Sequence, residues 1–178
     1  TLAQLQEHLR AFLPAPLLAP ADDGPNSRQR IYSLRLTFEC LLGQMLTPHT
    51  ACREVACQVQ ALFRAHGRDL PDAGDSVYVQ ARLRLPRQRL EQALIATALA
   101  ADLRIGSGGQ LGGRPVIAVD GSTVQLADTP KNQKRYPRPS THKRGCGFPV
   151  MKLAVLFSLA SGAVLRVLTG SLHQHDSR

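Results

Sequence analysis

The chain has 178 residues, a length that suits one or two small domains. Apolar residues make up 43% of it and charged residues 20%, a balance that excludes collagen-like, coiled-coil and wholly disordered chains. Lysine and arginine total 22 against 13 acids, so the net charge is +9. Such a surplus favours a polyanionic partner, nucleic acid before an anionic membrane.

The positive charge is concentrated in the C-terminal third. Residues 1–113 carry 12 basic and 10 acidic side chains, whereas residues 114–178 carry 10 basic and 3 acidic ones. The longest charge-free apolar stretch there, residues 153–165, is too short to span a bilayer, so we expect no membrane partner. No leader pattern opens the chain, and the cysteines at 40, 52, 57 and 146 lack metal-site spacing. We therefore expect a cytoplasmic protein with buried free thiols.

The first hundred residues have the periodicity of helices. A helical pattern over residues 2–12 ends at a proline-rich segment, residues 14–25. Further helices are predicted over about 29–46, 50–66, 75–84 and 86–103, with Asp75 as an N-cap and Pro86 in a first turn. Five glycines within residues 106–113 predict a flexible linker. A phosphate-binding loop is the alternative, but its Lys-Ser/Thr pair is missing.

The pattern changes from helices to strands after the glycines. Strands are predicted at 116–126, 153–159 and 163–169, with a turn at Ser161-Gly162. The predicted fold class is α+β: a helical DNA-binding or accessory domain over 1–105, a linker over 106–113, and the first strands of a mixed α/β domain over 114–178. Three strands would leave a sheet edge and a face uncovered, so we expect this second domain to be incomplete.

Asp120 is the first candidate for chemistry. It follows an apolar run and precedes Gly121 and Ser122. A carboxylate at the end of a strand can hold a divalent cation, and small neighbours let a phosphodiester approach. Asp-Gly between two apolar runs is also a frequent hairpin turn, and these residues alone favour the turn.

The segment from Thr129 to Val150 is the second candidate, because it has six permanent positive charges and no negative one. Its prolines predict an extended loop whose cations neutralise phosphates while Tyr136 stacks on a base or sugar. A solvated loop is the alternative. The six cations are Lys131, Lys134, Arg135, Arg138, Lys143 and Arg144.

Two weaker patterns are also present. Arg82 and Arg84 lie in the segment 78–86, where two predicted helices join. This arrangement is compatible with a helix-turn-helix, but the pattern alone favours an arginine-bearing solvent face. His173 and His175 would point to different faces of a strand, and Asp176 suits a helix cap. A metal site is therefore not expected at the histidines.

Several motifs together resemble one known family. They are Val116–Thr123 (VIAVDGST), Asp128–Gln133 (DTPKNQ), Tyr136-Pro137, Gly145–Pro149 (GCGFP) and, upstream, the Tyr78–Pro86 pattern YxxARxRLP. In this order they resemble the DDE transposases of bacterial insertion sequences, the IS-four type. The resemblance runs from about Phe38 to the end of the chain.

The resemblance implies a ribonuclease-H-like catalytic domain with an Asp, Asp, Glu triad that binds two Mg²⁺ or Mn²⁺ ions. By motif position, Asp120 would be the first acid, at the end of the first strand, and would bridge both metals. The implied reaction is hydrolytic nicking at terminal inverted repeats of double-stranded DNA and strand transfer into target DNA. Self-association on DNA and a location at the bacterial nucleoid are implied as well.

The chain departs from the family in its acids. Neither Asp128 nor Asp176 matches a further triad position, and one carboxylate cannot hold two ions. We therefore expect a transposase fragment that does not cleave DNA by itself. The alternatives are a non-catalytic DNA-binding remnant of a transposase and a basic RNA-binding domain.

Overall fold

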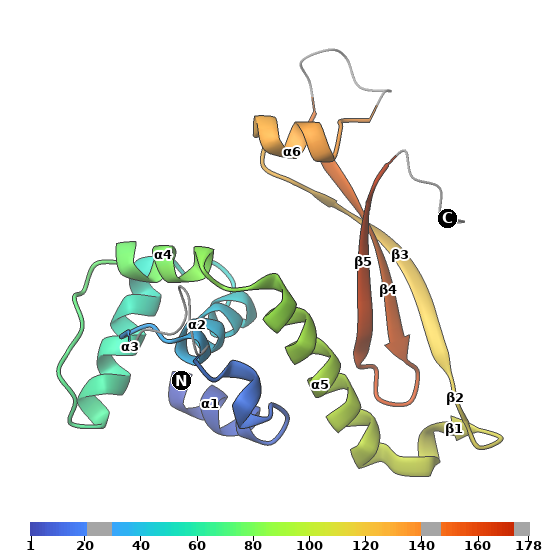
Figure 1. Ribbon diagram of the computed structural model, residues 1–178, viewed down its shortest axis with the longest axis horizontal. Helices are drawn as coiled ribbons and strands as arrows, with labels where there is room; N and C mark the ends of the chain where they lie inside the picture. Colours follow the sequence, from blue (N-terminus) through green and yellow to red (C-terminus); the bar gives the residue numbers. More distant parts are fainter. Residues whose placement is uncertain (21–29, 140–146, 173–178) are drawn as a thin grey trace. The chain divides into compact units, whose positions relative to one another are not determined.

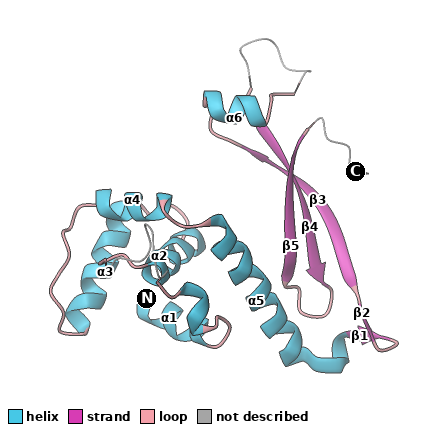
Figure 2. Ribbon diagram, in the orientation of Figure 1, coloured by secondary structure: helices cyan, strands magenta, loops and turns pink. Residues whose placement is uncertain are grey.

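The computed structural model describes residues 1–20, 30–139 and 147–172. Helices come first and antiparallel strands follow, which confirms the predicted α+β class (Figure 1; Figure 2). The chain forms two compact units, residues 1–96 and 97–178. The boundary between them lies within a helix rather than in the glycine-rich segment.

Helices build the first unit. Ser33 caps α2 by accepting a hydrogen bond from the Leu36 amide at 3.2 Å, so this helix begins at Leu34 and not near residue 29 as predicted. Asp75 holds the N-cap position of α4 as predicted, but its side chain makes no capping hydrogen bond. The elements are α1 (Leu2–Arg10), the 3-10 helix η1 (Ala15–Leu18), α2 (Leu34–Leu46), α3 (Cys52–Ala65), α4 (Ser76–Leu83) and the start of α5 (Arg87–Ile105).

The C-terminus of α3 is closed by a Schellman motif. Gly67 has a φ of 63°, which favours a residue without a side chain. Its amide donates to the Arg64 carbonyl at 3.1 Å, and the Arg68 amide donates to the Phe63 carbonyl at 3.0 Å. The turn therefore fixes the backbone of Arg68 beside the last turn of α3.

The core of the helical unit surrounds Tyr78, whose side chain is fully buried. The Tyr78 hydroxyl donates to Gln44 Oε1 at 2.9 Å, and its ring lies 5.6 Å from the ring of Tyr32. Burial raises the pKa of Tyr32 and of the Cys40 thiol to about 12 each. Cys40 is buried as predicted, whereas Cys57 is exposed, so the prediction of buried thiols is wrong for Cys57.

The second unit is built on a three-stranded antiparallel sheet in the order β3-β4-β5. The three predicted strands are confirmed, and β4 begins three residues earlier than predicted. Gly162, the second residue of the predicted Ser161-Gly162 turn, has a φ of 68° and lies in the connection between β4 and β5. The strands are β3 (Ile117–Gln125), β4 (Val150–Ser158) and β5 (Val164–Ser171).

The glycine-rich segment has regular structure where a flexible linker was predicted. Gly106–Gly109 form the 3-10 helix η3, and β1 (Gln110–Leu111) pairs with β2 (Arg114–Pro115). Gly112 and Gly113 have φ values of 58° and 75°, so they make the tight turn of this hairpin. A side chain at Gly109 would bring its Cβ within 2.2 Å of the Ala160 Cβ, so this position accepts only glycine without movement.

A hydrogen bond joins the end of α5 to the β4–β5 turn. Ser161 Oγ donates to Asp102 Oδ1 at 2.5 Å and accepts from the Ala163 amide at 3.1 Å. Hydrogen bonding from serine, Ser161 first, lowers the pKa of Asp102. The contact thus ties the helix to the sheet within the second unit.

Both faces of the sheet carry exposed apolar side chains. Val119 on one face is 68% exposed, and Val167 on the other is 37% exposed. None of the helices formed by the described residues is long and apolar enough to cross a lipid bilayer.

We expect Val59→Ala to lower the free energy of unfolding by about 2 kcal/mol, because Val59 has no exposed surface and its truncation leaves a cavity. Chemical denaturation with circular dichroism measures this change. The matched control is Val77→Ala on α4, where the side chain is 44% exposed and the change should stay within about 0.5 kcal/mol. Equal losses in the two variants would contradict the packing described above.

Candidate nucleic-acid interface

Asp120 lies in the middle of β3, directly opposite Val155 of β4. The prediction that it ends a strand is therefore wrong, and so is the alternative of a hairpin turn at Asp-Gly. The strand continues because Gly121 pairs with Ala154 in the ladder, and the β-branched Thr123 and Val124 extend it. Long-range pairing with β4 overrides the local turn preference.

The Asp120 carboxylate is exposed to solvent. Its Oδ1 accepts a hydrogen bond from the Gly121 amide at 2.8 Å. By register, Val155 and Val167 lie on the same face of the sheet, so the carboxylate is surrounded by apolar neighbours. Within residues 1–20, 30–139 and 147–172, no group of three or more His, Cys, Asp or Glu side chains could hold a metal. The described residues therefore do not fit the two-ion centre that the resemblance implies.

The basic segment begins with a helix, α6 (Pro130–Arg135), where an extended loop was predicted. Thr129 Oγ1 accepts from the Asn132 amide at 3.2 Å, and Pro130 occupies the first turn, which its fixed φ favours. Asn132 Nδ2 also donates to the Ala127 carbonyl at 2.9 Å. Threonine followed by proline is a helix-start signal, and it could have revealed α6 from the sequence alone.

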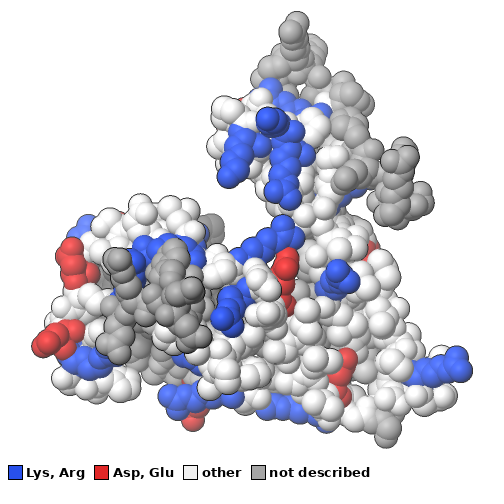
Figure 3. Space-filling model, viewed as in Figure 1, with Lys and Arg blue, Asp and Glu red and all other residues white. Residues whose placement is uncertain are grey.

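Three of the predicted cations lie on one side of α6. Lys131, Lys134 and Arg135 are spaced three and four residues apart, are exposed, and have no ion pair among the described residues. Figure 3 shows lysine and arginine side chains gathered over α6. The Arg135 guanidinium lies 5.5 Å from the ring centroid of half-buried Tyr136. We call Lys131, Lys134 and Arg135 the α6 cation patch.

Arg138 has a different environment from the patch. Its Nη2 donates to both carboxylate oxygens of Asp128, at 2.8 and 2.7 Å. Gln133 Nε2 donates to the same carboxylate, and the bonds from Arg138 and Gln133 lower the pKa of Asp128. The ion pair joins the segment before α6 to the segment after it. Arg138 is thus paired with an acid of the protein, unlike the cations of the patch, and its predicted phosphate contact stays a prediction.

Arg82 packs against the core of the helical unit and is half-buried. Its Nη1 donates to Gln44 Oε1 at 3.3 Å and to Cys52 Sγ at 3.4 Å, and its guanidinium lies 5.7 Å from the Tyr78 ring centroid. Arg82 is half-buried among α2, α3 and α4 rather than on an open solvent face, and its predicted DNA contact stays a prediction. Arg84 is half-buried in the short connection to α5.

The remaining predictions fall outside the described residues. These are the phosphate contacts of Lys143 and Arg144 and the positions of His173, His175 and Asp176. Sequence patterns also missed Glu39, a buried acid on α2, and the pocket above it. An acid between Phe38 and Cys40 in an apolar run is the one signal that could have pointed to it.

Comparison with protein-family models, with curated proteins and with solved structures finds no match for this chain. The motifs quoted above are therefore the only link to the transposases, and the activity they imply is a proposal. What the geometry itself provides is an exposed carboxylate on β3 and the α6 cation patch that follows it in the chain.

The Asp128–Arg138 pair has a measurable consequence. We expect the Asp128 carboxyl to titrate below its ordinary value of 3.8, and Arg138→Gln to raise that midpoint, because the charged form loses its strongest partner. The stability from this pair should be complete above about pH 4 and lost as the pH falls through the lowered pKa. Carboxyl NMR titration of the wild type and of Arg138→Gln measures the two midpoints of Asp128. Lys134→Gln is the control and should leave the midpoint unchanged; a shift of equal size there would exclude a specific pair.

Proposed function

We propose that this chain binds double-stranded DNA through the α6 cation patch and acts in DNA transposition, as a DDE-type transposase of the insertion-sequence kind. Asp120 then holds the position of the first acid of a catalytic centre that the described residues do not complete, and terminal inverted repeats and target DNA are the partners. The observation that carries the proposal is the patch: Lys131, Lys134 and Arg135 are exposed together, form no ion pair within the described part of the chain, and follow the strand of Asp120.

The geometry of the patch suits a phosphate backbone. Lys131 and Arg135 are about one helical turn apart, on the order of 6 Å along the axis of α6. Along one strand, duplex DNA presents a phosphate about every 3.4 Å of its axis, so two cations about 6 Å apart can contact phosphates of the same strand at once. Tyr136 is the C-cap of α6 and lies beside Arg135 of the patch, so a strand bound by Arg135 would pass near its ring and offer a sugar or base for stacking.

The sheet supports the same assignment. The resemblance implies that the first acid lies on the first strand of a ribonuclease-H-like domain, and Asp120 lies on β3, the first strand of the three-stranded sheet, although in mid-strand rather than at its end. Among the described residues, β3 pairs on one side only, so its other edge is available for a further strand.

Binding without cleavage is the second candidate function, and one observation favours it. The described residues contain no cluster of acids that could hold metal ions around Asp120. Two-metal phosphodiester cleavage needs several carboxylates in register, and a single exposed aspartate does not provide them. We therefore assign DNA binding to the α6 cation patch and no catalytic step to the described residues.

Neutralising two cations of the patch tests DNA binding. We expect Lys134→Gln/Arg135→Gln to weaken duplex binding at low salt and to reduce the slope of log affinity against log salt by about two, because two phosphate contacts are lost. Fluorescence anisotropy with a labelled duplex, titrated between 50 and 200 mM salt, measures the slope.

The matched control is Arg53→Gln/Arg64→Gln, which removes the same charge from exposed positions of α3. Its slope should equal that of the wild type. Equal losses in both variants would mean that only net charge matters. Tighter binding to single-stranded RNA than to duplex DNA would favour the RNA-binding alternative, and preference for a terminal repeat over random duplex would favour a transposase.

We further expect the purified chain not to nick supercoiled plasmid in the presence of Mg²⁺ or Mn²⁺, since Asp120 has no partner carboxylates among the described residues. Agarose gel electrophoresis of the plasmid detects nicking. Metal-dependent nicking by the wild type that disappears in Asp120→Ala would overturn this expectation and establish an active catalytic centre.

A further inference from the structure

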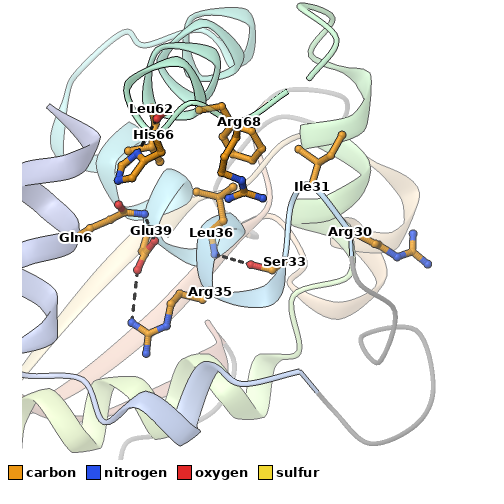
Figure 4. A pocket seen from close by; sticks show the side chains of 11 residues that line it. Gln6, Arg30, Ile31, Ser33, Arg35, Leu36, Glu39, Leu62, His66 and Arg68 are labelled. Carbon is orange, nitrogen blue, oxygen red and sulfur yellow. Dashed lines mark hydrogen bonds and ion pairs between the residues drawn. The ribbon is translucent and has the colours of Figure 1, made fainter. Parts of the chain in front are cut away.

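A pocket of about 600 Å³ opens on the helical unit, and none of the residues assigned to DNA above lines it. Its walls come from α1, the first turns of α2, the end of α3 and the residues just before α2 (Figure 4). A volume of this size is typical of sites for small molecules. The pocket lies wholly within residues 1–96, so it belongs to one compact unit.

Glu39 lies at the base of this pocket and is 2% exposed. Its Oε2 accepts a hydrogen bond from Gln6 Nε2 at 2.7 Å, and its Oε1 lies 3.5 Å from Arg35 Nη1, as the dashed lines in Figure 4 show. Burial raises the pKa of Glu39, while the contacts with Gln6 and Arg35 oppose this change. Glu39 and Arg35 therefore form a pair whose charges largely cancel.

Because the charges of Glu39 and Arg35 largely cancel, Arg68 adds a positive charge to the pocket that no acid of the described residues balances. Its Cζ lies 4.1 Å from the Phe63 ring centroid, and Figure 4 shows its guanidinium in the middle of the lining residues. No carboxylate of the described residues lies within ion-pair distance of it. Arg68 is thus an exposed guanidinium that stacks on the Phe63 ring, and its two-pronged N–H geometry suits an oxyanion.

Two further features of the lining favour an anion. The first turn of α2 borders the pocket at Ser33 and Leu36, where the partial positive charge of a helix start adds to that of Arg68. His66 lines the same wall, and its Nδ1 donates to the Leu62 carbonyl at 2.8 Å, so its Nε2 donates to an oxyanion only when the ring is protonated. Arg30 also lines the pocket, but Figure 4 shows its side chain pointing away from the others.

We propose that this pocket binds the phosphate monoester of a small molecule or of a nucleic-acid strand end, with Arg68 as its principal contact. A phosphate monoester offers two oxygens to the Arg68 fork, and the apolar side chains of Leu36 and Phe63 accommodate the body that carries it. The proposal is independent of the α6 cation patch and does not rest on the proposed function.

Calorimetric titration of the full chain with inorganic pyrophosphate and with adenosine monophosphate tests the pocket. We expect Arg68→Met to weaken binding of both probes at least tenfold, because the charged contact is lost while an apolar stem remains over Phe63. Arg64→Met is the matched control: Arg64 is an exposed arginine at the same helix end that does not line the pocket. Its affinity should stay within about twofold of the wild type.

Two other variants keep the test decisive if Arg68→Met is poorly folded. Ile31→Glu places an acid at the rim, where the side chain is 45% exposed, and should abolish binding with little effect on folding. Glu39→Gln removes the buried negative charge and should tighten binding severalfold. Weaker binding in Glu39→Gln would contradict the assignment, as would equal losses in the Arg68 and Arg64 variants or no binding of either probe by the wild type.

The source of the monoester is decided by one more comparison. A short oligonucleotide with a 5′-phosphate is titrated beside the same strand without it and beside adenosine monophosphate, with the wild type and with Arg68→Met. A phosphate-dependent gain for the strand that Arg68→Met removes identifies a strand end. Tighter binding of the mononucleotide than of the strand identifies a free small molecule.

Discussion

The arrangement of the second unit depends on β4, because this strand pairs with β3 on one side and with β5 on the other. Its register with β3 is continuous over nine residue pairs, from Ile117 opposite Ser158 to Gln125 opposite Val150. That ladder holds Asp120 in extended backbone in mid-strand and carries β3 onward to the segment that folds as α6. Any slip of one residue would move Asp120 to the opposite face of the sheet.

Net charge says less about DNA contact than the partners of each cation do. Arg138 is held by both oxygens of Asp128, and Arg82 is held by Gln44 and the Tyr78 ring. Both arginines help to build the fold, the first around α6 and the second between helices. The α6 cation patch differs because its side chains are exposed and have no acidic partner among the described residues. This contrast singles out three of the predicted cations as exposed and unpaired within the described residues.

Periodicity predicted most of the helices and all three strands of the sheet, because each has an apolar pattern that its own packing requires. It placed Asp120 wrongly, since the local preference of Asp-Gly for a turn is outweighed by pairing with a strand thirty residues later. The Asp128–Arg138 pair escaped prediction because only α6 brings the two ends of that segment together. The pocket escaped it entirely, since Glu39 and Arg68 come from different elements and meet only in the folded unit.

The two anion-binding features proposed for this chain differ in their physics, and this difference makes them separable. The α6 cation patch acts through exposed charges. Salt screens the attraction of such charges for phosphates beyond about 10 Å at 0.1 M ionic strength. The pocket acts through one guanidinium, Arg68, whose geometry is set by Phe63 and by the turn at Gly67. Directed hydrogen bonds in a partly enclosed site are less sensitive to salt than surface charges. Moderate salt should therefore weaken duplex binding steeply while binding of a phosphate monoester in the pocket persists.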